Sequence, residues 1–344
     1  MTTLTIEQIA ELADVSRSTV SRVLNNHPSV RPAVRDRILR IISENDYAPQ
    51  AAARSLASRR TNVIGLVIPR SAAVIFSDPF FPHVIQGITE ACTSRGYFLM
   101  LSMVTADLEQ GFYNRILRSR HFDGVLMLSS DVDDPILPLL MKDRTPLVLV
   151  GRHPYFTNLS WVDVENREGA REAVMHLIGL GHNHIATING PLHMAAGIDR
   201  RDGYKQALLE AGLPINPEIM VEGDFTQQGG YLAMTRLLNL PQRPTAVFVA
   251  SDTMAFGALR AIHEAGLSVP GDIALVSFDD LPSALFATPP LTTMHQPIYE
   301  MGFAAAELLI GRLERQDGLP PQRRIPTTLV IRQSCGAAMM CRPG

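Results

Sequence analysis

The sequence has no long apolar run, and this absence excludes an integral membrane protein. No stretch of about 18 or more apolar residues occurs in its 344 residues, which is the length that a membrane-spanning helix needs. The N-terminus is polar and shows no pattern of a secretion signal. A hydrophobic content of 46% with 19% charged residues is typical of a globular protein, and we expect a cytoplasmic one.

Cysteine and lysine are also scarce. The three cysteines, Cys92, Cys335 and Cys341, have neither metal-ligand spacing nor a disulfide pattern, so we expect reduced thiols and no structural metal. Only two lysines occur among the 31 basic residues, so arginine carries almost all of the positive charge. Residues 1–60 hold nine arginines and six acidic residues, a net charge of +3, while the remainder carries −6. A basic head on an acidic body indicates that the head is the part that meets phosphate.

The first 45 residues predict three short helices. Thr5 with Gln8 fits a capping box at the start of the first helix, whose apolar residues recur at helical spacing. Ser16 is a good N-cap for the second, which turns Val20 and Val23 inward. The polar side chains of the second helix point the other way, and they are of types that read DNA bases or contact phosphates: Arg17, Ser18, Ser21 and Arg22.

A basic segment follows the three helices. Residues 50–60 contain strong helix formers but are too few to make a stable helix alone. Leu56 is a lone large apolar residue in this polar setting. Such a side chain can wedge between base pairs in the minor groove and kink the duplex. A plain three-helix bundle with a solvated polar face is the alternative interpretation, and the hinge segment makes DNA binding the stronger one.

These motifs resemble those of the lactose/galactose-repressor family of bacterial transcription regulators. The resemblance runs through Thr5-Ile6-x-x-Ile9-Ala10, Val15-Ser16-x-x-Thr19-Val20-Ser21-Arg22-Val23-Leu24-Asn25, Tyr47-x-Pro49-x-x-Ala52-x-x-Leu56 and nearly all of the remainder. It implies that residues 17, 18 and 22 read operator bases. It places further residues at the DNA: Thr5, Ser16, Thr19, Ser21, Asn25, Arg31, Tyr47, Arg54 and Leu56.

The rest of the chain alternates short apolar runs with helical patterns. Strands are expected near 63–69, 98–103, 124–128, 147–151, 185–189, 246–250 and 274–278. Buried strands that alternate with helices predict parallel sheets covered on both faces, and two such sets predict two α/β lobes. The family resemblance implies a periplasmic-binding-protein-like core. We expect a helix-turn-helix domain at 1–48, a hinge helix at 49–60 and an effector-binding, dimerising core at 61–344. Within the core, lobe 1 would take about 61–160 and 292–324, and lobe 2 about 161–291 and 325–340.

Ligands of open α/β sheets bind beyond the C-terminal strand ends, and those ends carry acids, arginines and aromatic rings here. This chemistry suits a sugar, whose hydroxyls bind to charged groups and whose ring face packs on an aromatic side chain. The family resemblance assigns Arg200, Phe225, Ser251, Asp252 and Asp279 to the effector. The strand-end pattern adds four more: Asp78, Phe80, Arg152 and Asp163. Asp163 has an alternative role as a helix cap.

The sequence therefore predicts a homodimeric repressor, without cofactor or catalytic residues, that binds a pseudo-palindromic operator under control of a sugar effector. Gly190-Pro191-Leu192-x-Met194 and the Ser77–Pro82 stretch are similar to maltose-type regulators, so an α-glucoside is one candidate. A purine corepressor on the same scaffold is the alternative. A transport-type solute-binding protein and a glycoside hydrolase using Asp252 and Asp279 are less consistent with the DNA-binding head. His182 and His184 resemble a metal pair but lie in a predicted turn without partner ligands.

Overall fold

The computed structural model describes residues 4–24, 27–45, 47, 60–104, 111, 121–128 and 131–337. The chain divides into two compact units, Met1–Thr61 and Asn62–Gly344, and each is considered by itself. Within the described ranges, no helix combines the length and the apolarity that crossing a membrane requires.

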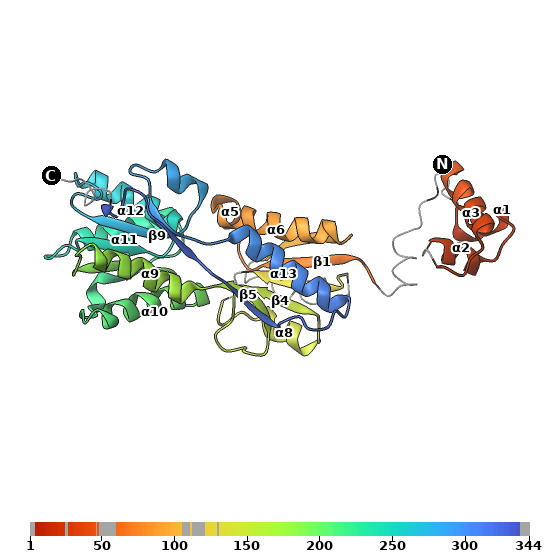
Figure 1. Ribbon diagram of the computed structural model, residues 1–344, viewed down its shortest axis with the longest axis horizontal. Coiled ribbons are helices and arrows are strands. Elements are labelled where there is room, and N and C mark those ends of the chain that lie inside the picture. Colours follow the sequence, from red (N-terminus) through yellow and green to blue (C-terminus); the bar gives the residue numbers. More distant parts are fainter. Residues whose placement is uncertain are drawn as a thin grey trace. The chain divides into compact units, whose positions relative to one another are not determined.

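The N-terminal unit contains the three predicted helices, α1 (Ile6–Leu12), α2 (Arg17–Leu24) and α3 (Pro32–Glu44), drawn in red in Figure 1. The predicted capping box is present, because the Thr5 side chain accepts from the backbone N–H of Gln8 at 3.3 Å and the Gln8 side chain accepts from that of Thr5 at 2.8 Å. Ser16 Oγ accepts from the Thr19 N–H at 3.2 Å, as expected of the N-cap of α2. The helices enclose a small core: Ile9, Ala10, Ala13, Val20, Val23 and Ile38. The predicted hinge helix lies, except for Arg60, outside the described residues.

The larger unit consists of two α/β lobes. Lobe 1 has β1 (Val63–Ile68), β2 (Phe98–Met103), β3 (Gly124–Leu128), β4 (Leu147–Val150), β5 (Ser160–Val164) and β11 (Gln322–Ile325). All six are parallel, in the order β11-β5-β4-β3-β1-β2. The lobe 1 helices are α5 (Ala72–Ser77), α6 (Phe80–Ser94), α8 (Ile136–Lys142) and α13 (Ile298–Leu313).

Lobe 2 repeats this plan with one antiparallel edge. Its strands are β6 (Ile185–Asn189), β7 (Met220–Glu222), β8 (Ala246–Val249), β9 (Ala274–Asp279), β10 (Thr292–His295) and β12 (Thr328–Val330). They lie in the order β12-β10-β9-β8-β6-β7, and β12 is antiparallel to β10. The helices are α9 (Asn166–Gly179), α10 (Ala195–Glu210), α11 (Gln227–Leu238) and α12 (Asp252–Glu264), with the short 3₁₀ turns η3 (Pro217–Ile219) and η4 (Pro282–Phe286).

The chain crosses between the lobes three times, slightly later than the sequence indicated. Residues 161–164, which the sequence assigned to lobe 2, belong to β5 of lobe 1, so the chain passes into lobe 2 between Val164 and Asn166. Likewise β10 belongs to lobe 2, and the return to lobe 1 falls at Gln296 and Pro297. The third crossing separates β11 from β12. The segment Ser160–Val164 is short and rich in β-branched and aromatic residues, a pattern that fits a buried strand and a crossover equally well, and this explains the difference at the first crossing.

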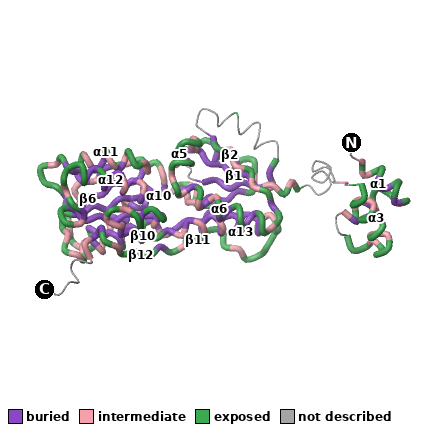
Figure 2. Tube along the Cα trace, turned by 90° about the horizontal axis from the view of Figure 1, so that it is seen from above, coloured by how far each residue is buried: buried purple, intermediate pink, exposed green. Residues whose placement is uncertain are grey.

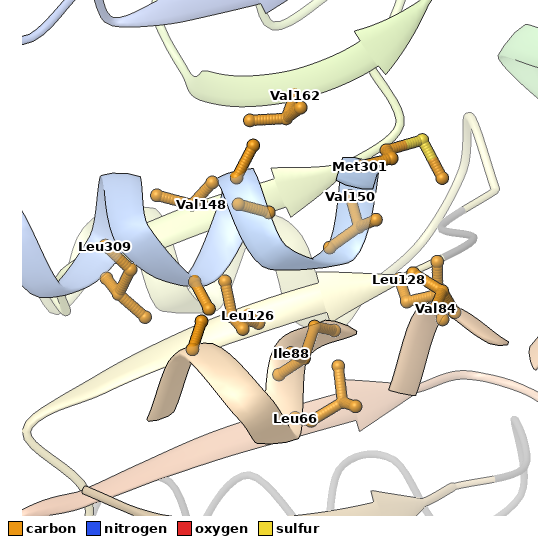
Figure 3. Close-up of a cluster of buried hydrophobic side chains, with 14 of the residues drawn as sticks. Leu66, Val84, Ile88, Leu126, Leu128, Val148, Val150, Val162, Met301 and Leu309 are labelled. Carbon is orange, nitrogen blue, oxygen red and sulfur yellow. The ribbon is translucent and has the colours of Figure 1, made fainter. Parts of the chain in front are cut away.

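The central strands of each sheet are buried on both faces, as Figure 2 shows by its purple strands inside a greener outer shell, whereas the edge strands β2 and β11 of lobe 1 are largely exposed. In lobe 1, Leu126 and Leu128 join the core beneath α6 and α13, while Val125 and Met127 join a second core beneath α8. Figure 3 shows the first of these cores, where side chains of α6 and α13 meet those of four strands. Successive side chains of a strand point to opposite faces of the sheet, and this accounts for the two cores of lobe 1.

Helices α6 and α13 lie side by side although they are some 200 residues apart in the chain (Figure 1). Glycines at the contact permit this approach. A methyl group on Gly87 would lie 2.1 Å from the carbonyl oxygen of Tyr299, and one on Gly302 would lie 2.3 Å from that of Val84. The close packing of α6 against α13 in lobe 1 therefore depends on glycine at both positions.

We predict that Gly87→Ala lowers the free energy of unfolding by about 1–3 kcal/mol, because its methyl group would force α6 and α13 apart. Gly179→Ala is the matched control, since Gly179 ends α9 and a methyl group there meets nothing within 4 Å. That substitution should raise the free energy of unfolding by about 0.4–1 kcal/mol through the lower entropy of the unfolded chain. Urea unfolding measures both, and equal effects of the two substitutions would contradict the packing argument.

Candidate functional site

A cavity of about 520 Å³ lies between the two lobes. Its walls are made by the segments that follow the C-terminal ends of β1, β4 and β5 in lobe 1 and of β6, β7, β8, β9 and β10 in lobe 2. This is the place where open parallel sheets bind ligands, and the volume falls within the roughly 300–1,000 Å³ of small-molecule sites.

The structure brings eight of the nine predicted effector residues to this cavity: Asp78, Phe80, Arg152, Asp163, Arg200, Phe225, Ser251 and Asp279. They come from both lobes, so a molecule in the cavity would touch both. The lining includes acidic, basic and aromatic side chains, the types on which the sugar-binding hypothesis rests.

Arg200, on α10, is the most heavily bonded of these residues. It is 4% exposed. Its Nε donates to Asn166 Oδ1 at 2.9 Å, and its Nη2 donates to Gln296 Oε1 at 2.6 Å. Its Nη1 donates to Asp279 Oδ1 at 3.2 Å and to the carbonyl oxygen of Ala250 at 2.6 Å. Four donated hydrogen bonds compensate the desolvated charge, although burial still lowers the pKa of Arg200.

The Arg200 guanidinium also stacks on an aromatic ring, with Cζ 3.7 Å from the centroid of Phe278. Its neighbour Asp279 is equally buried, and burial raises the pKa of that carboxyl well above its usual value in spite of the nearby Arg200. These contacts therefore fix Arg200 and Asp279 in place on the lobe 2 side of the cavity.

Arg152 and Asp163 form a second group, on the lobe 1 side. Arg152 donates through Nε to Asp199 Oδ2 at 2.9 Å and through Nη2 to Asp199 Oδ1. Asp163 Oδ2 lies 3.9 Å from Arg152 Nε, and Asp163 Oδ1 accepts from Asn166 Nδ2 at 3.0 Å. Burial raises the pKa of Asp163 to about 6. Arg152, which the sequence offered as an effector contact, is thus bonded across the lobes to α10.

Asp78 and Phe80 close the lobe 1 side near α12. Asp78 Oδ1 accepts from the backbone N–H of Phe80 at 3.0 Å and lies 3.4 Å from Thr253 Oγ1 of lobe 2. Burial raises the pKa of Asp78. A hydroxyl of a bound sugar could donate to this carboxylate.

Phe225 brings an aromatic face from lobe 2. Its φ is 63°, which is unfavourable for a side chain with a β-carbon. Its ring packs on Gly190, where an added methyl group would lie 2.2 Å from Phe225 Cζ. Because Gly190 has no side chain, the Phe225 ring can pack directly on its backbone at the cavity wall.

Asp252 is the exception among the predicted effector residues, because the structure places it outside the cavity lining. It is fully buried and accepts three hydrogen bonds within lobe 2, from Ser277 Oγ at 2.5 Å, Thr293 Oγ1 at 2.8 Å and the Leu281 N–H at 2.7 Å. Burial raises its pKa to about 6. Its role is to hold the turn after β9, in which Asp279 has φ 116°. Ser251, one residue earlier, does face the cavity and caps α12.

Sequence reasoning missed several polar residues of the lining: Arg70, Asn166, His193, Thr253 and Gln296. Arg70, Asn166 and Gln296 each follow a strand, so the strand-end rule could have found them had it been applied to every strand. His193 and Thr253 stand in loop and helix positions that carry no such signal.

In the head, α2 presents a polar face. Arg17, Ser18 and Arg22 are exposed, opposite the buried Val20 and Val23. Of the other predicted DNA contacts, the exposed ones are Thr5, Ser16 and Arg31, and the half-buried ones are Thr19, Ser21 and Tyr47. Asn25, Arg54 and Leu56 lie outside the described residues.

The two histidines that resemble a metal pair make separate hydrogen bonds. His182 Nδ1 is 3.1 Å from Thr245 Oγ1, and His184 Nε2 is 3.3 Å from the carbonyl oxygen of Gln242. In the part of the chain that the structure describes, no three His, Cys, Asp or Glu side chains gather as metal ligands would.

Comparison with known proteins gives matches to both units. Residues 5–50 match the model of bacterial regulatory proteins of the lacI family, and residues 174–335 match that of a periplasmic binding protein-like domain. The regulator CelR of Thermobifida fusca is 39% identical over 332 residues, which are 96% of this chain and 98% of CelR. The ribose operon repressor of Escherichia coli K12 is 37% identical over 329 residues, 95% of this chain and 98% of the repressor.

Solved structures match as well. A CelR–cellobiose complex has a TM-score of 0.77 at 37% identity and covers 96% of this chain and 99% of its own. The lac repressor dimer bound to operator and the anti-inducer ONPF has a TM-score of 0.84 at 29% identity and covers 97% and 99%. The predicted helical head and two-lobed parallel α/β core are thereby confirmed.

Asp163 provides a test of the electrostatics of the cleft. Its native pKa of about 6 exceeds the 3.8 of an unperturbed carboxyl, so its stabilising contribution is present below pH 4 and is lost as the pH rises through 6. An asparagine at this position would stay neutral at every pH. We predict that the stability of Asp163→Asn relative to the natural protein increases by about 2 kcal/mol as the pH rises from 4.5 to 7.5, because part of the loss in the natural protein has already occurred at pH 4.5. Urea unfolding at both pH values measures this gain, and a difference independent of pH would contradict it.

Proposed function

Because the chain belongs to the LacI family of bacterial regulatory proteins, we propose that it represses transcription by binding a pseudo-palindromic operator as a homodimer under control of a sugar. It is a DNA-binding regulator and not an enzyme. The observation that carries the proposal is the cavity at the strand ends, where Arg200 bonds both to the lobe 2 wall and to two of the three crossings. It would act in the cytoplasm, and on the nucleoid when bound to its operator.

The DNA-binding part of the proposal rests on α2. Arg17, Ser18 and Arg22 would read base edges in the major groove, since arginine pairs with guanine through two donors. Further residues of the head would contact phosphates: Thr5, Ser16, Thr19, Ser21, Asn25 and Arg31. Tyr47 and Arg54 would lie at the backbone, and Leu56 would wedge into the minor groove as the hinge orders on DNA.

Dimerisation would use α6 and α12. The outer side of α6 presents exposed polar side chains, among them Gln86, Thr89 and Glu90, while its inner side packs in the lobe core. Two copies would present their recognition helices to successive half-sites of a symmetric operator.

The effector part rests on the cavity and on relatives. Asp78, Asp163 and Asp279 offer acceptors for hydroxyls, and Phe80 and Phe225 offer ring faces. The name of the ribose operon repressor and the solved complex of CelR with cellobiose support a sugar. A sugar that contacts both lobes would bind their two relative orientations with different affinity and so change operator binding.

The experiment is a titration of the protein on labelled DNA from its own promoter, with cellobiose, maltose, ribose or a nucleobase present, followed by fluorescence anisotropy. At least one sugar should change the operator Kd by about 5- to 150-fold, and the same sugar should raise the melting temperature. A response to nucleobases alone would contradict the sugar assignment, and the absence of sequence-preferring DNA binding would contradict the regulator.

Arg200→Lys should weaken binding of the active sugar by at least about tenfold, because one ammonium cannot span Asn166, Gln296 and Asp279 together. Arg201→Lys is the matched control, since Arg201 is bonded to its neighbour Asp202 and does not line the cavity. Isothermal titration calorimetry measures both variants. Equal losses would show that Arg200 has no particular role at the effector.

Arg22→Ala should cost about 1–3 kcal/mol of operator binding and much less of binding to unrelated DNA, because a base contact carries specificity. Arg37→Ala removes the same charge from an exposed position on α3, and should weaken both kinds of DNA alike. Anisotropy with operator and scrambled duplexes at fixed salt compares them. If Arg22→Ala weakened binding to both duplexes equally, the proposal that Arg22 contacts a base would be wrong.

A further inference from the structure

Every arginine that lines the cleft is already paired with a carboxylate. The pairs, taken from the described residues, are Arg70 with Asp131, Arg152 with Asp199, and Arg200 with Asp279. His193, the other side chain there that can become cationic, has its Nε2 at 3.7 Å from Asp131. A ligand entering the cleft would therefore meet positive charge that is already compensated.

The pair formed by Arg152 differs from the other two. Asp131 and Arg70 both belong to lobe 1, and Asp279 and Arg200 both belong to lobe 2. Asp199 instead reaches from α10 of lobe 2 to a guanidinium that follows β4 of lobe 1. Both side chains are well shielded, with exposed fractions of 22% for Arg152 and 13% for Asp199.

The Asp199 carboxylate accepts two hydrogen bonds from one edge of the Arg152 guanidinium, donated by Nε and Nη2. This is the geometry by which arginine binds a phosphate. A phosphate group in the cleft could engage that edge only by displacing Asp199, which would then be left as a well-shielded charge without a partner.

The remaining charges of the lining also disfavour an anion. Asp78 and Asp224 line the cavity without a salt bridge to an arginine among the described residues, and Asp163 shares Arg152 with Asp199 at a distance of 3.9 Å. Asp78 and Asp163 are buried, and burial raises the pKa of both. As carboxylates, these groups accept hydrogen bonds from the hydroxyls of an uncharged sugar and repel a phosphate.

We propose that Asp199 is a specificity-determining residue, which occupies Arg152 across the lobes and so restricts the cleft to uncharged sugars and excludes phosphorylated ones. The inference rests on the sugar-binding function proposed above and adds the charge state of the ligand. Without Asp199, Arg152 would retain Asp163 at 3.9 Å as its acidic neighbour and would offer its fork to a phosphate.

The test is a gain of binding. Calorimetry at pH 7.5 with glucose 6-phosphate should give no saturable binding to the natural protein. Asp199→Asn should bind glucose 6-phosphate at least about tenfold more tightly than the natural protein does, the effect of roughly one charge-assisted hydrogen bond. Adding Arg152→Gln to Asp199→Asn should abolish the gain, which assigns it to the Arg152 guanidinium.

Glu210→Gln is the matched control, because Glu210 lies on the same helix but is bonded to Arg171 and Gln206 and not to Arg152. It should gain nothing. Asp199→Glu should keep phosphate out, since it restores the carboxylate. Far-ultraviolet circular dichroism checks that each variant folds, and the measurement on the natural protein decides the exclusion even if Asp199→Asn does not fold.

Tight binding of glucose 6-phosphate by the natural protein would overturn the inference. Equal gains in Asp199→Asn and Glu210→Gln, or a gain that survives Arg152→Gln, would overturn it as well. These failures differ from a failure of the proposed function. A phosphorylated sugar that releases the operator would leave sugar control intact and overturn the charge selection. A phosphate gain in Asp199→Asn, together with no effect of any sugar on operator binding, would support the charge selection and contradict the sugar effector.

Discussion

The buried guanidinium of Arg200 is the interaction on which the arrangement of the cleft depends. A charge at 4% exposure is costly unless its donors are satisfied, and here four donors reach acceptors from four different segments. Two of those acceptors, Asn166 and Gln296, stand where the chain crosses between the lobes. The hydrogen bonds to Arg200 therefore offset the cost of burying its charge. They also fix the first two crossings between the lobes, so one side chain both lines the cavity and holds these crossings in place.

Strain at the cavity wall is supported in the same way, by buried groups behind it. Asp279 has φ 116°, and Asp252 holds the turn after it by accepting the Leu281 N–H. Phe225 has φ 63° and rests on Gly190. Residues in such conformations persist where surrounding contacts over-determine them. The acceptor and the aromatic face that a sugar would meet are thus placed by the scaffold before any ligand arrives.

The architecture and most of the cavity could be predicted because they follow from local rules. Period and capping located the helices of the head, with Thr5 and Ser16 as N-caps of the first two. The strand-end pattern together with the family resemblance selected nine candidate effector residues, of which eight line the cavity. These local rules do not distinguish between two consecutive residues at the same strand end. Nothing in the sequence Ser251-Asp252 tells which side chain faces the cavity and which turns into the lobe.

Long-range pairing was also beyond the sequence. Arg152 is an obvious ligand for a sugar when seen alone, and its partner Asp199 lies 47 residues away on the other lobe. The α6–α13 contact through Gly87 and Gly302 is equally invisible, because a helical glycine has no signal of what packs on it. Both depend on how the lobes are assembled, which a pattern of strands and helices does not specify.

The three crossings are tied to one another, and this decides what an effector must do. Arg200 bonds beside the first and second, and the N–H of Glu165 donates to the carbonyl oxygen of Ile325 at 3.0 Å, which joins the first and third. Such a bundle lets the lobes turn as bodies while the crossings stay together. A ligand that touches lobe 2 alone binds every lobe orientation equally and shifts nothing, however tight it is. Switching therefore requires a molecule that reaches from Arg200 to the lobe 1 groups around Asp78, and the cavity, lined from both lobes, is built to select for that reach.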